Sequence, residues 1–145
     1  MKPTLFVAIV APLLLASDLD NSGRLAEPEY LPQLARQLLK KKMRRHGADM
    51  TQLFLSTTLL QHEKTRILAS EISKEVRLSR PTVGGEDDLN TALPEKFFVL
   101  QDEVRARARN LAEAAKGTDD AEMAKSFGLL MQTCVECHSA FLKRE

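Results

Sequence analysis

Apolar residues recur at helical spacing in four separate stretches of the chain, at residues 32–60, 62–78, 94–116 and from 119 onward. The sequence has no sustained alternation of apolar and polar residues, which would instead favour strands. The pattern therefore predicts four amphipathic helices. The inward faces are predicted to carry Met43, His46, Met50, Leu53 and Phe54 in the first helix and Ile67, Leu68, Ile72 and Val76 in the second, with Glu75 facing water.

Capping and breaking residues support these boundaries. Pro94 is a favourable first residue for the third helix, and Gly117 is a good residue for ending it. Thr118 or Asp119 can cap the fourth helix. The connections before the second and fourth helices are short, which makes the helices they join antiparallel neighbours. We predict an all-α fold, an antiparallel four-helix bundle over residues 31–145.

Composition adds little to this picture. The chain has 145 residues, of which 43% are hydrophobic and 28% charged, as in an ordinary one-domain globular protein. The formal net charge is only +1, so no global field favours nucleic acid or a membrane surface. No nucleic-acid partner is predicted.

The N-terminus reads as an export signal. Residues 1–17 begin with Lys2 and continue into an apolar run that is too short for a comfortable transmembrane span. Because Pro12 interrupts the run and the positive charge is small, a retained membrane anchor is the alternative. Either interpretation puts the mature domain outside the cytoplasm, and the expected location is the periplasm.

Residues 18–30 form a polar segment with the spacing of a calcium-binding loop. An EF-hand needs a helix on each side, however, and here the entering helix would be the export signal. Pro28 also restrains the backbone just before Glu29, the residue at the bidentate position. We interpret residues 18–30 as a polar linker rather than a calcium site. The matching positions are Asp18, Asp20, Ser22, Gly23, Leu25 and Glu29.

Both cysteines of the chain lie in one motif, Cys134-Val135-Glu136-Cys137-His138. C-x-x-C-H is the attachment pattern of c-type haem, in which the two thiols bond the haem vinyl groups and the histidine ligates the iron. On a helix the three residues share one face. A zinc site would need four ligands, and His46 and His62 lie at no zinc-finger spacing. A thioredoxin-like pair would need a βαβ context. One covalent haem c is predicted, with His138 as its proximal ligand.

The distal ligand must come from another helix, and an inward methionine of the first helix is the obvious donor. Thioether sulfur binds ferrous iron well, and a His/Met pair raises the reduction potential. The inward face of that helix offers Met43, Met50 and also His46.

The second half of the chain resembles the class II cytochromes c, the group of cytochrome c′ and cytochrome c-556. The resemblance rests on Ser126-Phe127-Gly128, the haem motif near the C-terminus, Ser139-Ala140-Phe141 and the basic Lys143-Arg144. It extends to Gly84-Gly85, Pro94, Phe97-Phe98 and the turn at residues 117–120. The family consists of periplasmic four-helix bundles, often dimeric through the first two helices, so the oligomeric state stays open between monomer and homodimer.

The resemblance implies that a residue of the first helix faces the distal side of the iron. Alignment puts Met43 there, with Met50 or His46 as alternative ligands, or no distal protein ligand at all. Leu39 stands where the family often has arginine, and Leu142 where it often has a basic residue. A methionine ligand implies a six-coordinate iron and a one-electron carrier, which is not an enzyme and works with redox partner proteins. A missing ligand implies a five-coordinate haem that binds small gases such as nitric oxide.

Overall fold

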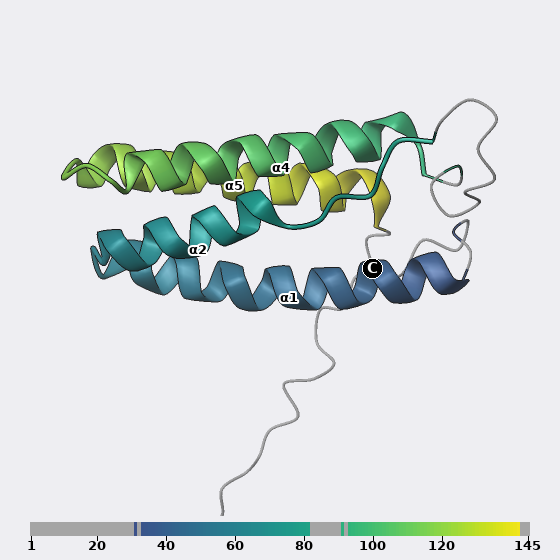
Figure 1. Cartoon of the computed structure of the whole chain (residues 1–145), viewed down its shortest axis with the longest axis horizontal. Coiled ribbons are helices and arrows are strands. Elements are labelled where there is room, and N and C mark those ends of the chain that lie inside the picture. Colours follow the sequence, from purple (N-terminus) through teal and green to yellow (C-terminus); the bar gives the residue numbers. More distant parts are fainter. Residues whose placement is uncertain (1–30, 32, 82–90, 92, 143–145) are drawn as a thin grey trace, which may run out of the picture.

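The computed structural model describes residues 31, 33–81, 91 and 93–142. The predicted export signal and the calcium-like segment lie outside these residues. The described part is built from helices joined by turns and extended segments, as Figure 1 shows. The helices are α1 (Gln33–Thr58), α2 (His62–Lys74), α4 (Glu95–Ala114) and α5 (Asp120–Phe141).

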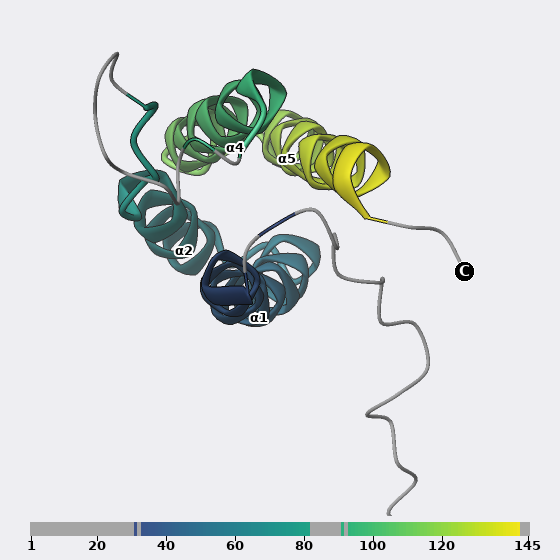
Figure 2. The same cartoon turned by 90° about the vertical axis from the view of Figure 1, so that its right-hand side faces the viewer.

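The helices follow one another around an antiparallel bundle, seen end-on in Figure 2. Helix α2 packs against α1 and α4, and α5 packs against α4 and α1, so each helix has two neighbours. The prediction of an all-α four-helix bundle is confirmed. None of the helices in the described part is long and apolar enough to cross a membrane.

The apolar core is divided into two clusters. The larger one occupies the end of the bundle where α1 turns into α2, and the smaller one joins the start of α4 to the segments that flank it. Met50 and Val104 pack against the larger cluster, whereas Phe97 packs against the smaller. The larger cluster comprises Leu53, Ala69, Ile72, Ala108, Leu111, Ala112, Ala115, Met123 and Leu130, and the smaller Leu31, Leu93 and Phe98.

The buried face of α2 differs from the predicted one. Ile67 is exposed, while Thr65 and Ser73 are buried. These two polar residues can be buried because their hydroxyls donate hydrogen bonds, Thr65 Oγ1 to Ser56 Oγ at 2.9 Å and Ser73 Oγ to Ser70 O at 2.8 Å. On α1 the predicted inward residue Phe54 is also exposed.

Helix α2 ends at Lys74, four residues before its predicted end. The chain beyond it runs without helical structure to Pro81. Its backbone groups bond side chains of other helices: Gln101 on α4 donates to Leu78 O and accepts from Leu78 N, both at 3.0 Å, and Lys42 on α1 donates to Val76 O at 3.1 Å. These bonds replace the intrahelical ones that a longer α2 would make.

Charged groups hold the same segment, residues 75–81, against α4. Arg77 and Arg80 both pair with Asp102, at 2.5 and 2.9 Å, and Arg80 also pairs with Glu95. The Arg80 guanidinium lies 5.7 Å from the centre of the Phe98 ring. Arg80, and after it Arg77, lowers the pKa of the Asp102 carboxyl. The segment is therefore fixed along α4 by both backbone and ionic contacts.

The predicted cap of the last helix is found at Asp119, whose carboxylate accepts a hydrogen bond of 3.0 Å from the Glu122 amide. The turn between α1 and α2 is less favourable. Gln61 N donates to Ser56 O and Leu60 N to Thr57 O, the two bonds of a Schellman motif. Leu60, at the left-handed position of this motif, has φ of 53°. Left-handed backbone costs a residue with a Cβ roughly 1 kcal/mol.

Replacing Leu60 by glycine is expected to raise the free energy of unfolding by about 1 kcal/mol, because glycine adopts this φ without strain and Leu60 is half exposed. Urea unfolding followed by circular dichroism measures the change. Leu59→Gly is the matched control, since Leu59 is also exposed and does not have a positive φ, and it should lower stability. A destabilised Leu60→Gly variant would contradict the assignment.

Candidate functional site

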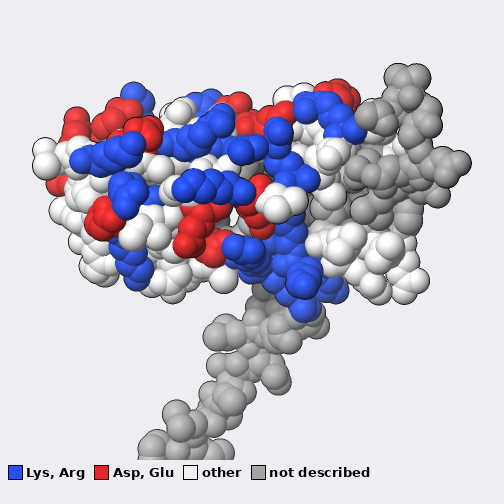
Figure 3. Space-filling view, viewed as in Figure 1, with Lys and Arg blue, Asp and Glu red and all other residues white. Residues whose placement is uncertain are grey.

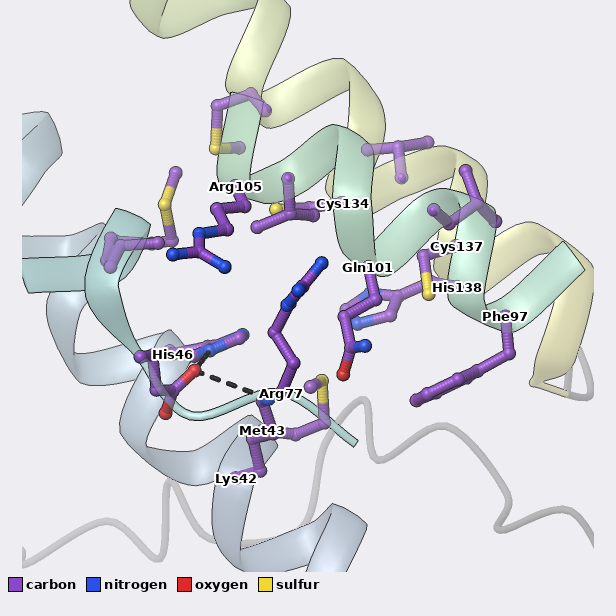
Figure 4. Close-up of a pocket in the computed structure, with 18 residues that line it drawn as sticks. Lys42, Met43, His46, Arg77, Phe97, Gln101, Arg105, Cys134, Cys137 and His138 are labelled. Atoms are coloured by element: carbon purple, nitrogen blue, oxygen red, sulfur yellow. Dashed lines mark hydrogen bonds and ion pairs between the residues drawn. The ribbon is translucent and has the colours of Figure 1, made fainter. Parts of the chain in front are cut away.

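A cavity of about 280 Å³ lies between the two core clusters. Its volume is close to that of the smaller ligand pockets of proteins. All four helices and the segment at residues 75–81 contribute to its wall (Figure 4). The lining residues are Lys42, Met43, His46, Gly47, Met50, Ile72, Glu75, Arg77, Phe97, Leu100, Gln101, Val104, Arg105, Met131, Cys134, Val135, Cys137 and His138.

Helix α5 brings the whole C-x-x-C-H motif to this cavity. Cys134, Cys137 and His138 are helical and occupy positions i, i+3 and i+4, so they project from one face, as predicted. The two cysteines are free thiols and half-buried. The arrangement presents two sulfur atoms and one imidazole to a common ligand.

Burial raises the pKa of both thiols, and the neighbouring Cys134 adds to the rise at Cys137. At neutral pH the thiols are therefore protonated and weak nucleophiles toward oxidants and alkylating agents. Burial also lowers the pKa of His138, and His46 across the cavity lowers it further. His138 is therefore neutral at pH 7, the form in which an imidazole binds a metal.

Helix α1 forms the wall opposite α5. Met43, His46 and Met50 all line the cavity, as the predicted inward face requires. Their surroundings differ. Met50 also packs against the larger core cluster, whereas Met43 is 36% exposed and belongs to neither cluster. Gly47 lies between them, and a Cβ built on it meets nothing within 4 Å, so the α1 backbone faces open space there.

His46 is held by a carboxylate that was predicted to face water. Its Nε2 bonds Glu75 Oε2, and Lys42 Nζ lies 3.5 Å from the same oxygen. The Glu75 side chain is only 17% exposed. Glu75 is turned inward because α2 has already ended before it, and the segment that follows passes over the cavity. One of the two ring nitrogens of His46, Nε2, is thus engaged in an ion pair or hydrogen bond.

Sequence reasoning did not anticipate the polar residues that α4 and residues 75–81 contribute. Phe97, Gln101 and Arg105 lie four positions apart on α4 and all face the cavity. Their helical spacing can be seen in the sequence, but polar residues such as Gln101 and Arg105 are usually expected on the exposed face of a helix. Nε of Arg105 is buried and has no hydrogen-bond partner among the described residues. Arg77 reaches the cavity from residues 75–81, and no periodic signal marks it.

Comparison with known proteins agrees with the site. Residues 92–142, which include α4 and α5, match the family described as Cytochrome C'. This match to the second half of the chain supports the class II cytochrome c family. No curated protein and no solved structure matches the chain significantly. The predicted family is confirmed, and with it a haem-binding cytochrome with a four-helix fold.

The cavity fits such a ligand in three respects. Sulfur and imidazole donors share one wall, the bare backbone at Gly47 leaves room opposite them, and Arg105 offers an unpaired buried nitrogen to an anionic group. The described residues contain no group of three or more His, Cys, Asp or Glu side chains placed to hold a bare metal ion.

The raised thiol pKa values predict slow alkylation of the haem-free protein. At pH 8 iodoacetamide should modify Cys134 and Cys137 more slowly than in urea, because folding lowers the thiolate fraction. The folded rate should continue to rise with pH above 9. Mass spectrometry gives the rates, and circular dichroism of the same samples verifies that the helices are formed. Equal rates in the folded and unfolded protein would contradict the buried arrangement.

Proposed function

We propose that this protein is a periplasmic mono-haem c-type cytochrome that carries single electrons, with His138 and Met43 as the iron ligands and thioether bonds from Cys134 and Cys137. The observation that carries the proposal is the gathering of C-x-x-C-H from α5 and Met43 from α1 in one cavity. The bound haem c supplies the redox centre, whose iron alternates between the ferric and ferrous states. The protein turns over no substrate and is not an enzyme.

Each element has a separate task in this proposal. The thiols of α5 tether the cofactor at one edge, and the neutral imidazole of His138 supplies the proximal nitrogen. Apolar groups such as Phe97 and Leu100 exclude water from the flanks of the cavity. Exclusion of water and a thioether ligand both favour the ferrous state. The chain thereby sets the potential without taking part in any bond rearrangement during transfer.

Met43 is favoured over the other candidates by what their side chains already contact. Met50 fills space against the larger core cluster, and His46 is paired with Glu75. Met43 belongs to neither core cluster and is not paired with Glu75, and its side chain projects into the cavity in Figure 4. A flexible thioether can adjust to the ligand it meets.

The Met43→Leu variant tests both the ligand and the function. The purified wild-type protein should show low-spin spectra in both redox states and a methionine–iron charge-transfer band in the ferric state. Met43→Leu should lose that band, become high-spin and bind nitric oxide or carbon monoxide. Met50→Leu is the matched control and should keep the low-spin spectrum. A high-spin wild-type spectrum would instead support the gas-binding alternative, and a low-spin Met43→Leu variant would overturn the ligand assignment.

Basic residues on α1 flank the cavity and support a role in attracting an anionic redox partner. Figure 3 shows Lys and Arg side chains gathered over the first half of α1. Lys42 and Met43 line the cavity, while the residues on either side of them are exposed. Such a patch raises the encounter rate with negative partners and loses its effect as salt screens it. The exposed basic residues are Lys40, Lys41, Arg44 and Arg45.

Reversing two of these charges should slow electron transfer to an anionic reagent. In the variant Lys41→Glu/Arg44→Glu, oxidation of the ferrous protein by hexacyanoferrate(III) at low salt should be roughly tenfold slower, and its salt dependence should weaken. Oxidation by a cationic cobalt(III) complex should become faster. Stopped-flow absorbance measures both rates. Lys64→Glu/Arg109→Glu makes the same change of net charge at exposed positions of α2 and α4, and it should have a much smaller effect. Equal effects from both variants would contradict a specific role of the basic residues of α1 in attracting an anionic partner.

A further inference from the structure

The wall of the cavity carries more positive than negative charge. Lys42, Arg77 and Arg105 line it, and Glu75 is the one carboxylate among its lining residues. Glu75 is already paired with Lys42. Leaving the histidines aside, Arg77 and Arg105 remain, and of these Arg77 is paired with Asp102, which does not line the cavity. A partly enclosed apolar space lined by two guanidinium groups is suited to a ligand with carboxylates.

Arg105 is the stronger sign of a missing anion. It is half-buried on α4, its Nε is buried without a partner, and within the described residues it makes no ion pair or hydrogen bond. A guanidinium remains charged at all ordinary pH values, and an unpaired buried charge is costly. Because Arg105 lines the cavity, an anionic group bound there can supply the missing partner.

Arg77 is positioned more firmly. Its Nη1 lies 2.5 Å from Asp102 Oδ1, which uses one of its three nitrogens and orients the guanidinium. Gln101 fixes the adjacent backbone by two hydrogen bonds to Leu78. The side chain is 46% exposed, so it stands where the cavity meets solvent. Figure 4 shows Arg77 and Arg105 reaching into the same space from different elements.

The chemistry of haem relates these arginines to the motif. Thioether bonds hold the vinyl edge of the macrocycle, and the two propionate carboxylates are on the opposite edge. Cys134 and Cys137 fix the vinyl edge to α5, so the carboxylate edge lies away from α5. Planar guanidinium groups bind carboxylates through paired hydrogen bonds. We propose that Arg105 and Arg77 bind the two haem propionates, one each. This inference rests on the proposed haem attachment and adds the residues that anchor the other edge.

The test compares holoproteins carrying Arg105→Gln, Arg77→Gln or both. Resonance Raman spectra should show a shifted propionate bending band in each single variant and two shifted bands in the double variant. Loss of a paired cation should also raise the pKa of the released propionate by at least about one unit, a tenfold change in proton affinity. The midpoint potential should then vary with pH in a range where that of the wild type is flat.

Arg109→Gln is the matched control, because it removes the same charge from an exposed position on the same helix outside the cavity. It should change neither the bands nor the pH profile. Arg105→Lys keeps the charge but loses the planar pair of donors, and it should shift the band while restoring most of the pH profile. It also serves as the deciding variant if Arg105→Gln yields no holoprotein.

Unchanged propionate bands and pH profiles in the Arg105 and Arg77 variants, or effects equal to those of Arg109→Gln, would overturn the proposal. Failure of the proposed function gives a different result. In that case the wild-type protein, exported in cells that make c-type cytochromes, shows no added haem mass on its C-terminal peptide. The mass measurement on the wild type and the Raman measurement on the variants therefore report separately on attachment and anchoring.

Discussion

The interruption of the apolar core is the constraint on which the rest of this structure depends. Protein interiors are close-packed, so a space of about 280 Å³ between two clusters marks a place for another molecule. The larger cluster holds one end of the bundle together without it. At the other end α1 and α5 face each other across the cavity rather than through packed side chains. A flat, largely apolar cofactor tethered to α5 would join the two clusters into one core.

The polar groups of the cavity are separated by element, and this separation gives each wall its chemistry. Helix α5 supplies neutral groups, because burial keeps the thiols protonated and His138 uncharged. The cations come from α1, α4 and residues 75–81. Neutral donors on one side and cations on the other would orient an amphipathic ligand in a single direction. Glu75 reduces the positive charge of that side by pairing with Lys42 and His46, and it occupies Nε2 of His46.

Local sequence patterns predicted much of this molecule. The four helices follow from apolar spacing, and the face shared by Cys134, Cys137 and His138 follows from three positions within one helix. The burial of Thr65 and Ser73 could not be predicted from the apolar pattern, because their hydroxyls bond partners that only the fold or the backbone provides. The position of Arg77 could not be predicted for a different reason: its place in the cavity depends on where α2 ends and on contacts with α4.

The early end of α2 places an arginine where the cavity meets solvent rather than in the packed interior. Had the helix continued, Arg77 would follow Ala69 and Ser73 on the buried face, and Val76 would extend the apolar stripe of Ile72. Instead Gln101 takes both backbone groups of Leu78, and the chain leaves the helix after Lys74. Val76 is then 87% exposed, a loss of apolar burial that a chain selected only for packing would avoid. The exposed valine and the cavity-facing guanidinium are two consequences of one backbone change. The change makes sense if residues 75–81 serve the ligand rather than the helix.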